Sequence, residues 1–138
     1  MASMAGERRQ GPDGRIIAGW VLSTLFALFM IFASVAPKLL GLPVAGDTLA
    51  ALGWSRGWVL PIGLMELAFT LLYLAPRTSV LGAVLMTGLL GGAMATQIRV
   101  DAPLLSHELF GLYLAAFMWG GLWLRLPALR RLFPINQD

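Results

Sequence analysis

The stretch IIAGWVLSTLFALFMIFASVA, from Ile16 to Ala36, carries no charged residue. A helix of about 20 apolar residues, rising about 1.5 Å per residue, crosses the roughly 30 Å hydrocarbon core of a bilayer. The stretch therefore predicts a membrane-spanning helix. Its basic flank also suits a cleaved signal peptide, but the apolar run is longer than in such peptides and Pro37 would follow the cut. We expect an uncleaved span.

Three further apolar runs follow along the chain, and prolines fall beside or between them, where helices end. Only three residues, 76–78, separate the second run from the third, so these two runs should form a tight antiparallel hairpin. We predict an all-α integral membrane four-helix bundle. Its spans are about 16–36, 58–75, 79–98 and 109–126, within a transmembrane domain of residues 16–126, between a cytoplasmic N-terminal tail (1–15) and a basic cytoplasmic tail (127–138).

The composition agrees with a membrane protein. Of the 138 residues, 58% are apolar and only 12% are charged, and a soluble domain of this size has no interior large enough for so much apolar surface. The net charge is +3, but the basic residues are scattered beside the apolar runs, which argues against nucleic-acid binding. The chain has no cysteine, which excludes disulfides, thiol redox chemistry and cysteine-ligated metals within it.

The orientation is predicted from the distribution of lysine and arginine, which favour cytoplasmic loops. An orientation with both termini on the cytoplasmic side (N-in, C-in) places seven basic residues inside and three outside. The inner residues are Arg8, Arg9, Arg15, Arg77, Arg125, Arg130 and Arg131, and the outer ones are Lys38, Arg56 and Arg99.

The first outer loop, residues 38–57, is only moderately polar. Asp47 or Thr48 suits a helix N-cap before a short apolar turn. We therefore expect a short helix that lies at the membrane interface or re-enters the bundle.

Small residues recur at four-residue spacing, which allows close helix packing in a membrane. They form two rows on the third run and one on the fourth. Such rows suit a dimer face, but packing inside one bundle is the interpretation we favour. The residues are Gly88, Gly92 and Thr96, then Gly91 and Ala95, then Gly111 and Ala115.

Glu66 is the one charged residue in the second run. The predicted orientation places it in the outer half of the membrane, where a charge facing lipid costs about 2.5–3.5 kcal/mol. Glu66 should therefore face the interior and pair or take up a proton. Thr70 and Tyr73 follow at positions i+4 and i+7, on the same helical face. Lys38, at the outer end of the first span, carries its ammonium on a stem flexible enough to reach back.

Four more polar residues, Gln97, Arg99, His107 and Glu108, fall near the same outer half. One interpretation of the cluster is a site for a small ligand or quinone, with Lys38, Glu66 and Gln97 around an apolar cavity. A second is proton or ion passage, and a third is a Lys38–Glu66 ion pair that sets the helix register. We expect no metal, because His107 and Glu108 are adjacent rather than one turn apart.

Four segments give the chain a family resemblance: APKLLG (36–41), GLMEL (63–67), LGAVLMTGLLGGAMATQIRV (81–100) and LRLPALRRLFP (124–134). Over about residues 20–134 it resembles the DoxX-like family of small four-helix bacterial membrane proteins. In that family a histidine often stands where this chain has Gln97, followed closely by a basic residue, here Arg99. The substitution removes a titratable group from this position.

The resemblance implies a multi-pass protein of the bacterial inner membrane. Relatives include a membrane subunit of an archaeal thiosulfate:quinone oxidoreductase, and others are described as membrane partners of oxidative-stress enzymes. The hypothesis is therefore an accessory protein without catalysis of its own, which binds a quinone or another amphipathic molecule. Its partners would be lipid, a redox protein or a second copy of the chain. A transporter of small solutes or ions and a purely structural subunit stay open as alternatives.

Overall fold

A computed structural model describes residues 11 and 13–136, apart from the side chain of Glu108. This part of the chain is all-helical and contains no strand. The elements in chain order are α1 (Gly14–Phe29), the π-helical η1 (Met30–Val35), α2 (Ala36–Leu39), α3 (Pro43–Ala51), the 3₁₀-helical η2 (Arg56–Trp58), α4 (Val59–Leu74), α5 (Ser79–Arg99), the π-helical η3 (Leu104–Glu108), α6 (Phe110–Arg125) and α7 (Pro127–Leu132).

Three helical segments within the described chain are long and apolar enough to cross a membrane. They are Gly14–Leu39, Arg56–Leu74 and Ser79–Arg99, and they coincide with the first three predicted spans. The fourth predicted span corresponds to α6, which has 16 residues and is therefore about 24 Å long at about 1.5 Å rise per residue. The fourth crossing, the membrane-spanning four-helix bundle and the N-in/C-in orientation stay predictions.

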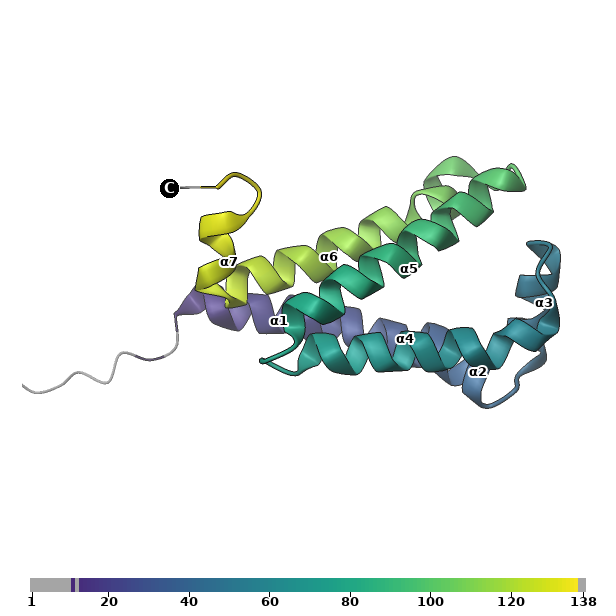
Figure 1. The fold of residues 1–138 in the computed structure, drawn as a ribbon, viewed down its shortest axis with the longest axis horizontal. Helices are drawn as coiled ribbons and strands as arrows, with labels where there is room; N and C mark the ends of the chain where they lie inside the picture. The colour runs from purple at the N-terminus through teal and green to yellow at the C-terminus, as the bar shows by residue number, and fades with distance from the viewer. Residues whose placement is uncertain (1–10, 12, 137–138) are drawn as a thin grey trace, which may run out of the picture.

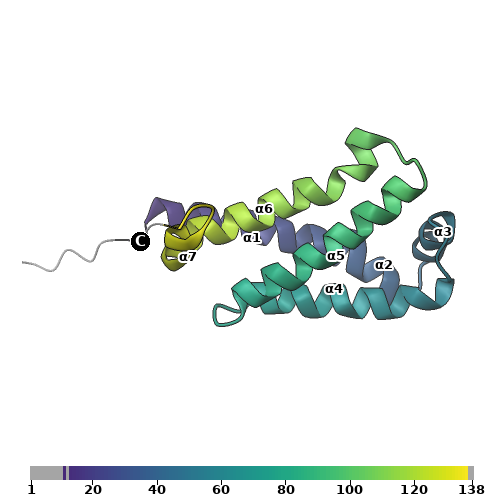
Figure 2. The same ribbon diagram turned by 45° about the horizontal axis from the view of Figure 1, so that its top comes forward.

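The long helices pack in pairs, α1 along α6 and α4 along α5, and α5 also contacts α6. The start of α1, the α4–α5 turn and α7 lie at one end of the molecule, called here the α7 end (Figure 1). The opposite end, called here the α3 end, carries α2, α3 and η3. There α3 runs across the direction of the long helices (Figure 1). Figures 1 and 2 both show α5 and α6 diverging from α4 toward the α3 end.

The core is formed where the helices converge. The fully buried large side chains include Phe26, Tyr73, Met86, Met118 and Leu122. Many large apolar side chains on the outer faces of the helices are exposed, as expected for a surface in contact with lipid.

Close contacts between helices depend on glycines that the sequence analysis did not single out. A Cβ on Gly19 would lie 2.7 Å from the carbonyl oxygen of Gly121, so α1 and α6 touch backbone to backbone. A Cβ on Gly82 would overlap the backbone of Tyr73, which ties α5 to α4. These positions satisfy the need for small residues at membrane helix contacts.

The predicted packing row on α5 is largely wrong as an internal contact. A Cβ on Gly88, Gly91 or Gly92 would meet no atom within 4 Å, and Ala95 is exposed. The row lies on an open face because α5 contacts α4 and α6 through other faces. On α6, a Cβ on Gly111 would lie 2.7 Å from Met94 Cγ, so this glycine lies close to α5.

The remaining member of that α6 row, Ala115, is partly buried against the core. Thr96, on the α5 row, donates its hydroxyl to the Gly92 carbonyl 2.9 Å away, within its own helix.

The short helix predicted in the first loop is present as α3, but its N-cap was predicted wrongly. The helix begins at Pro43, whose fixed φ and missing N–H suit the first helical position. Thr48 instead lies inside the helix and donates to the Val44 carbonyl, and Asp47 pairs with Arg56 at 2.8 Å.

Candidate functional site

A partly buried ion pair joins Lys38 of α2 to Glu66 of α4. The Lys38 Nζ lies 3.0 Å from Glu66 Oε2 and 3.2 Å from Oε1, and the two side chains are only 13% and 10% exposed. Ser34 completes the group: its hydroxyl donates to Glu66 Oε2 at 3.0 Å and lies 2.8 Å from Lys38 Nζ. Each charge is thus neutralised and hydrogen-bonded within the chain.

Local structure brings these groups together. Ser34 belongs to the π-helical η1, and Lys38, four residues later, also bonds the Ser34 carbonyl with its Nζ at 3.2 Å. Gly63 stands one turn before Glu66 on α4, and a Cβ there would lie 2.8 Å from Lys38 Cβ. The absence of a side chain at Gly63 lets the lysine stem lie against α4.

A cavity of about 210 Å³ opens beside the carboxylate. Its polar lining residues are Ser34, Glu66, Gln97 and His107, contributed by η1, α4, α5 and η3. The rest of the lining is apolar or small: Phe29, Met30, Ala33, Leu90, Ala93, Met94, Phe110, Gly111 and Leu114. The centres of the Phe29 and Phe110 rings are 5.4 Å apart, so these two rings, from α1 and α6, pack against each other in the lining.

Three of the predicted site residues, Glu66, Gln97 and His107, therefore line one cavity. Lys38 is not among the lining residues, but its ammonium pairs with the Glu66 carboxylate. The hydroxyl of Ser106 is 2.7 Å from His107 Nδ1. The side chain of Glu108 lies outside the described part of the chain.

Glu66, Thr70 and Tyr73 are all buried on the inward face of α4, as their spacing predicts. They do not form one site. The Thr70 hydroxyl donates to the Glu66 carbonyl at 2.7 Å, within its own helix. The Tyr73 hydroxyl lies near the α7 end, donates to the Met118 carbonyl at 2.7 Å and is 2.9 Å from Ser23 Oγ.

Arg99 also lies apart from the cavity lining. Its Nη2 donates to the Leu52 carbonyl at 2.6 Å, so the residue anchors the loop after α3 to the end of α5. Gly53, in that loop, has a φ of +80° and a missing Cβ that leaves room for the guanidinium. Arg99 therefore supports the α3 end of the fold.

The sequence analysis missed Ser34 and the two phenylalanines. Ser34 had a recognisable signal, because it is a polar residue in an apolar span and stands four residues before Lys38, on the same helical face. Phe29 and Phe110 had none, since aromatic residues are common in membrane helices.

Comparison with known families identifies the chain. The model of the DoxX-like family matches residues 21–121. The chain belongs to the DoxX-like family. All the residues that line the cavity of this DoxX-like protein fall inside the matched region. With three helices able to cross a bilayer, it is a multi-pass membrane protein in contact with lipid. No curated protein and no solved structure matches the chain.

Proposed function

We propose that this DoxX-like protein binds the head of a small amphipathic molecule in the cavity beside Glu66, and acts as an accessory membrane subunit. One observation carries the proposal: four polar side chains from four separate elements line one cavity with aromatic and aliphatic walls. Ligand sites are built in this way, from a mostly apolar lining with a few convergent polar groups.

The size of the cavity limits the ligand. Drug-sized ligands occupy sites of about 300–1,000 Å³, and this cavity has about 210 Å³. It therefore accepts a compact head group, while an apolar tail lies among the lipid-facing side chains. A ring with carbonyl or hydroxyl oxygens, such as a quinone, meets these requirements.

The polar groups match such a head. The Gln97 amide donates to a carbonyl or accepts from a hydroxyl, and the His107 imidazole can do the same. Glu66 accepts from a hydroxyl through the lone pairs that Lys38 and Ser34 leave free. The π-helical segments η1 and η3 both contribute to the lining, and π-helical turns occur often at functional sites.

The proposed membrane placement has four crossings, N-in and C-in, in the bacterial inner membrane. The excess of arginine in the segments assigned to the inside supports it. The described chain also begins and ends at the same end of the molecule (Figure 1). The cavity then lies in the outer half of the bilayer, where a redox partner outside the cytoplasm or a second copy of the chain has access to its mouth.

Transport is not the function that this arrangement favours. Tyr73 lies in an apolar cluster with buried Phe26, Met30 and Met86, and Glu66 is not a member of that cluster. Thr70, which stands between them on α4, uses its hydroxyl within its own helix. A purely structural role for the ion pair has one supporting observation, because Lys38 and Glu66 satisfy each other without a ligand.

Binding of a quinone with a decyl tail to the detergent-purified protein tests the proposal, by native mass spectrometry and thermal shift. Decanol, which has the tail without the ring, is the ligand control. Gln97→Leu should raise the dissociation constant about tenfold, because it removes a hydrogen bond of about 1–1.5 kcal/mol. Thr96→Val, one residue away but outside the lining, should bind as the wild type does.

Two results would refute the binding proposal. One is equal binding of decanol and the quinone, which would mean that the head group is not recognised. The other is unchanged binding in Gln97→Leu and in His107→Leu, which would leave the ion pair as a structural element only.

A further inference from the structure

Arg125, near the C-terminal end of α6, holds a buried guanidinium at the α7 end, far along the molecule from the cavity. The residue is only 8% exposed. The guanidinium carbon lies 4.2 Å from the centre of the Trp20 ring and 4.9 Å from that of Tyr73. Its Nη2 donates to the Tyr73 carbonyl at 2.7 Å, near the end of α4.

These contacts leave the charge incompletely satisfied. A guanidinium has five N–H donors, and within the described residues Arg125 makes only the bond to Tyr73, while its buried Nε has no partner. Among the described residues, the carboxylates in ion pairs are those of Glu66 and Asp47, and both lie at the α3 end, away from Arg125. The C-terminus of α4 supplies about half a negative charge. A buried charge with so little compensation calls for an anion.

The surroundings of Arg125 add to the positive charge. Exposed Arg15 stands about one turn before Trp20 on α1, and exposed Arg77 follows Tyr73 in the α4–α5 turn. The one acidic residue described at this end is Asp13, whose carboxylate accepts from the Arg15 backbone N–H. An anionic head group is therefore favoured over a zwitterionic one, whose ammonium would meet these arginines.

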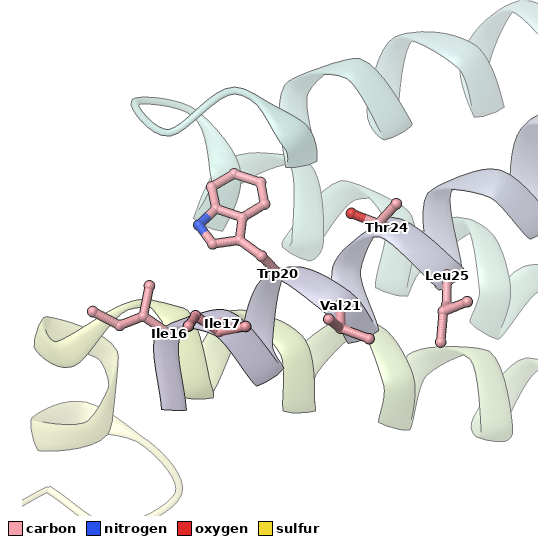
Figure 3. Close-up of a pocket in the computed structure, with 6 residues that line it drawn as sticks. All are labelled: Ile16, Ile17, Trp20, Val21, Thr24 and Leu25. Carbon is pink, nitrogen blue, oxygen red and sulfur yellow. The ribbon is translucent and has the colours of Figure 1, made fainter. Parts of the chain in front are cut away.

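An open, shallow apolar groove of about 590 Å³ runs along the outer surface of α1, on both sides of Trp20. It is lined by Ile16, Ile17, Trp20, Val21, Thr24 and Leu25 (Figure 3). Trp20 belongs both to the groove and to the stack with Arg125, so the groove passes beside that stack. A cation next to an apolar groove on a lipid-facing helix has the shape of a phospholipid site.

We propose that this end of the protein binds one anionic phospholipid. Its phosphate pairs with the fork of Arg125, near Arg15 and Arg77, and an acyl chain lies along the groove on α1. The planar fork of arginine matches phosphate oxygens in pairs, tryptophan favours the head-group level of a bilayer, and basic clusters select anionic lipids. The inference is independent of the cavity beside Glu66.

Thermal unfolding of the full chain in dodecyl maltoside tests the proposal, with phosphatidylglycerol, phosphatidylcholine or inorganic phosphate added. Phosphatidylglycerol should raise the unfolding temperature, and the other two additions should not. Trp20→Leu, which removes the stacked ring but keeps the Arg125–Tyr73 bond, should require about tenfold more phosphatidylglycerol for the same shift. Arg125→Gln should abolish the shift. Arg131→Gln removes the same charge from an exposed position on α7 and should respond as the wild type does.

Arg125 also caps α4. If Arg125→Gln does not fold for that reason, Trp20→Leu together with Arg77→Gln decides the question. An unchanged shift in both of these variants overturns the proposal. So does an equal shift with phosphatidylcholine, which would show that any lipid suffices. A shift produced by inorganic phosphate alone overturns the lipid as occupant and leaves a site for a free anion.

Discussion

Replacement of Lys38 by methionine should destabilise the protein by about 3–5 kcal/mol, the cost of leaving one partner of a buried ion pair alone. The Lys38 Nζ is 3.0 Å from Glu66 Oε2. At that distance and an effective dielectric constant of about 20, the Coulomb attraction is about 5 kcal/mol. Methionine has a similar volume but no charge, so Glu66 would keep only the bond from Ser34.

The double variant Lys38→Met/Glu66→Leu separates the charge interaction from packing. It removes both charges and fills the space with apolar atoms, so it should lie within about 1.5 kcal/mol of the wild type, because such replacements are often neutral or stabilising. The two single variants would then be strongly non-additive, with a coupling energy of at least about 2 kcal/mol.

The assay is reversible unfolding in mixed dodecyl maltoside–SDS micelles, followed by circular dichroism. Arg56→Met is the matched control, since it breaks the Arg56–Asp47 pair, whose side chains are 62% and 63% exposed. An exposed pair contributes about 0–1 kcal/mol. If Lys38→Met lowers the stability no more than Arg56→Met does, the Lys38–Glu66 pair contributes no more than an exposed pair, and the reasoning is refuted.

Three further predictions concern other contacts. Gly82→Ala should destabilise the protein by about 1–3 kcal/mol, because the new methyl group overlaps the backbone of Tyr73; unfolding at wild-type stability would contradict that close approach. Gly88→Ala should stabilise the monomer by about 0.5–1 kcal/mol in the same assay, since its Cβ meets open space; a loss of stability, or of an oligomer in native mass spectra, would reveal a contact with another chain. Arg99→Gln should speed amide hydrogen exchange in the loop around Leu52 without changing exchange in α4, because it removes the bond between that loop and α5; equal exchange rates in this loop for the wild type and the variant would mean that the bond does not hold the loop.

Much of the fold follows from the sequence. Long apolar runs set the helices, since a backbone in lipid must satisfy its hydrogen bonds within a helix or a closed barrel. A single carboxylate inside such a run had to face the interior, and Glu66 does. Its partner was also predictable, because Lys38 stands at the neighbouring helix end with a stem long enough to reach it.

Other features depended on contacts between helices. Spacing places Glu66 and Tyr73 on one face of α4, but that face extends along most of the helix, so the two residues reach different neighbours. Gln97 and Glu66 line one cavity at the end where α5 and α6 diverge from α4 (Figure 1). The π-helical geometry of η1 adds Ser34 to the ion pair, although no local pattern marks a π-helix in this stretch.

The sequence by itself determined which segments form helices and that the polar face of α4 avoids lipid, because these depend on composition and on a period of about 3.6 residues. Only the tertiary structure decided where the helices touch. Gly88 and Gly92 have the spacing of a packed row yet face open space, whereas isolated Gly19 and Gly82 lie at the tightest contacts. The reason is geometric: a contact depends on the tilt and rotation of two helices at once, and a small residue permits close approach without specifying its partner.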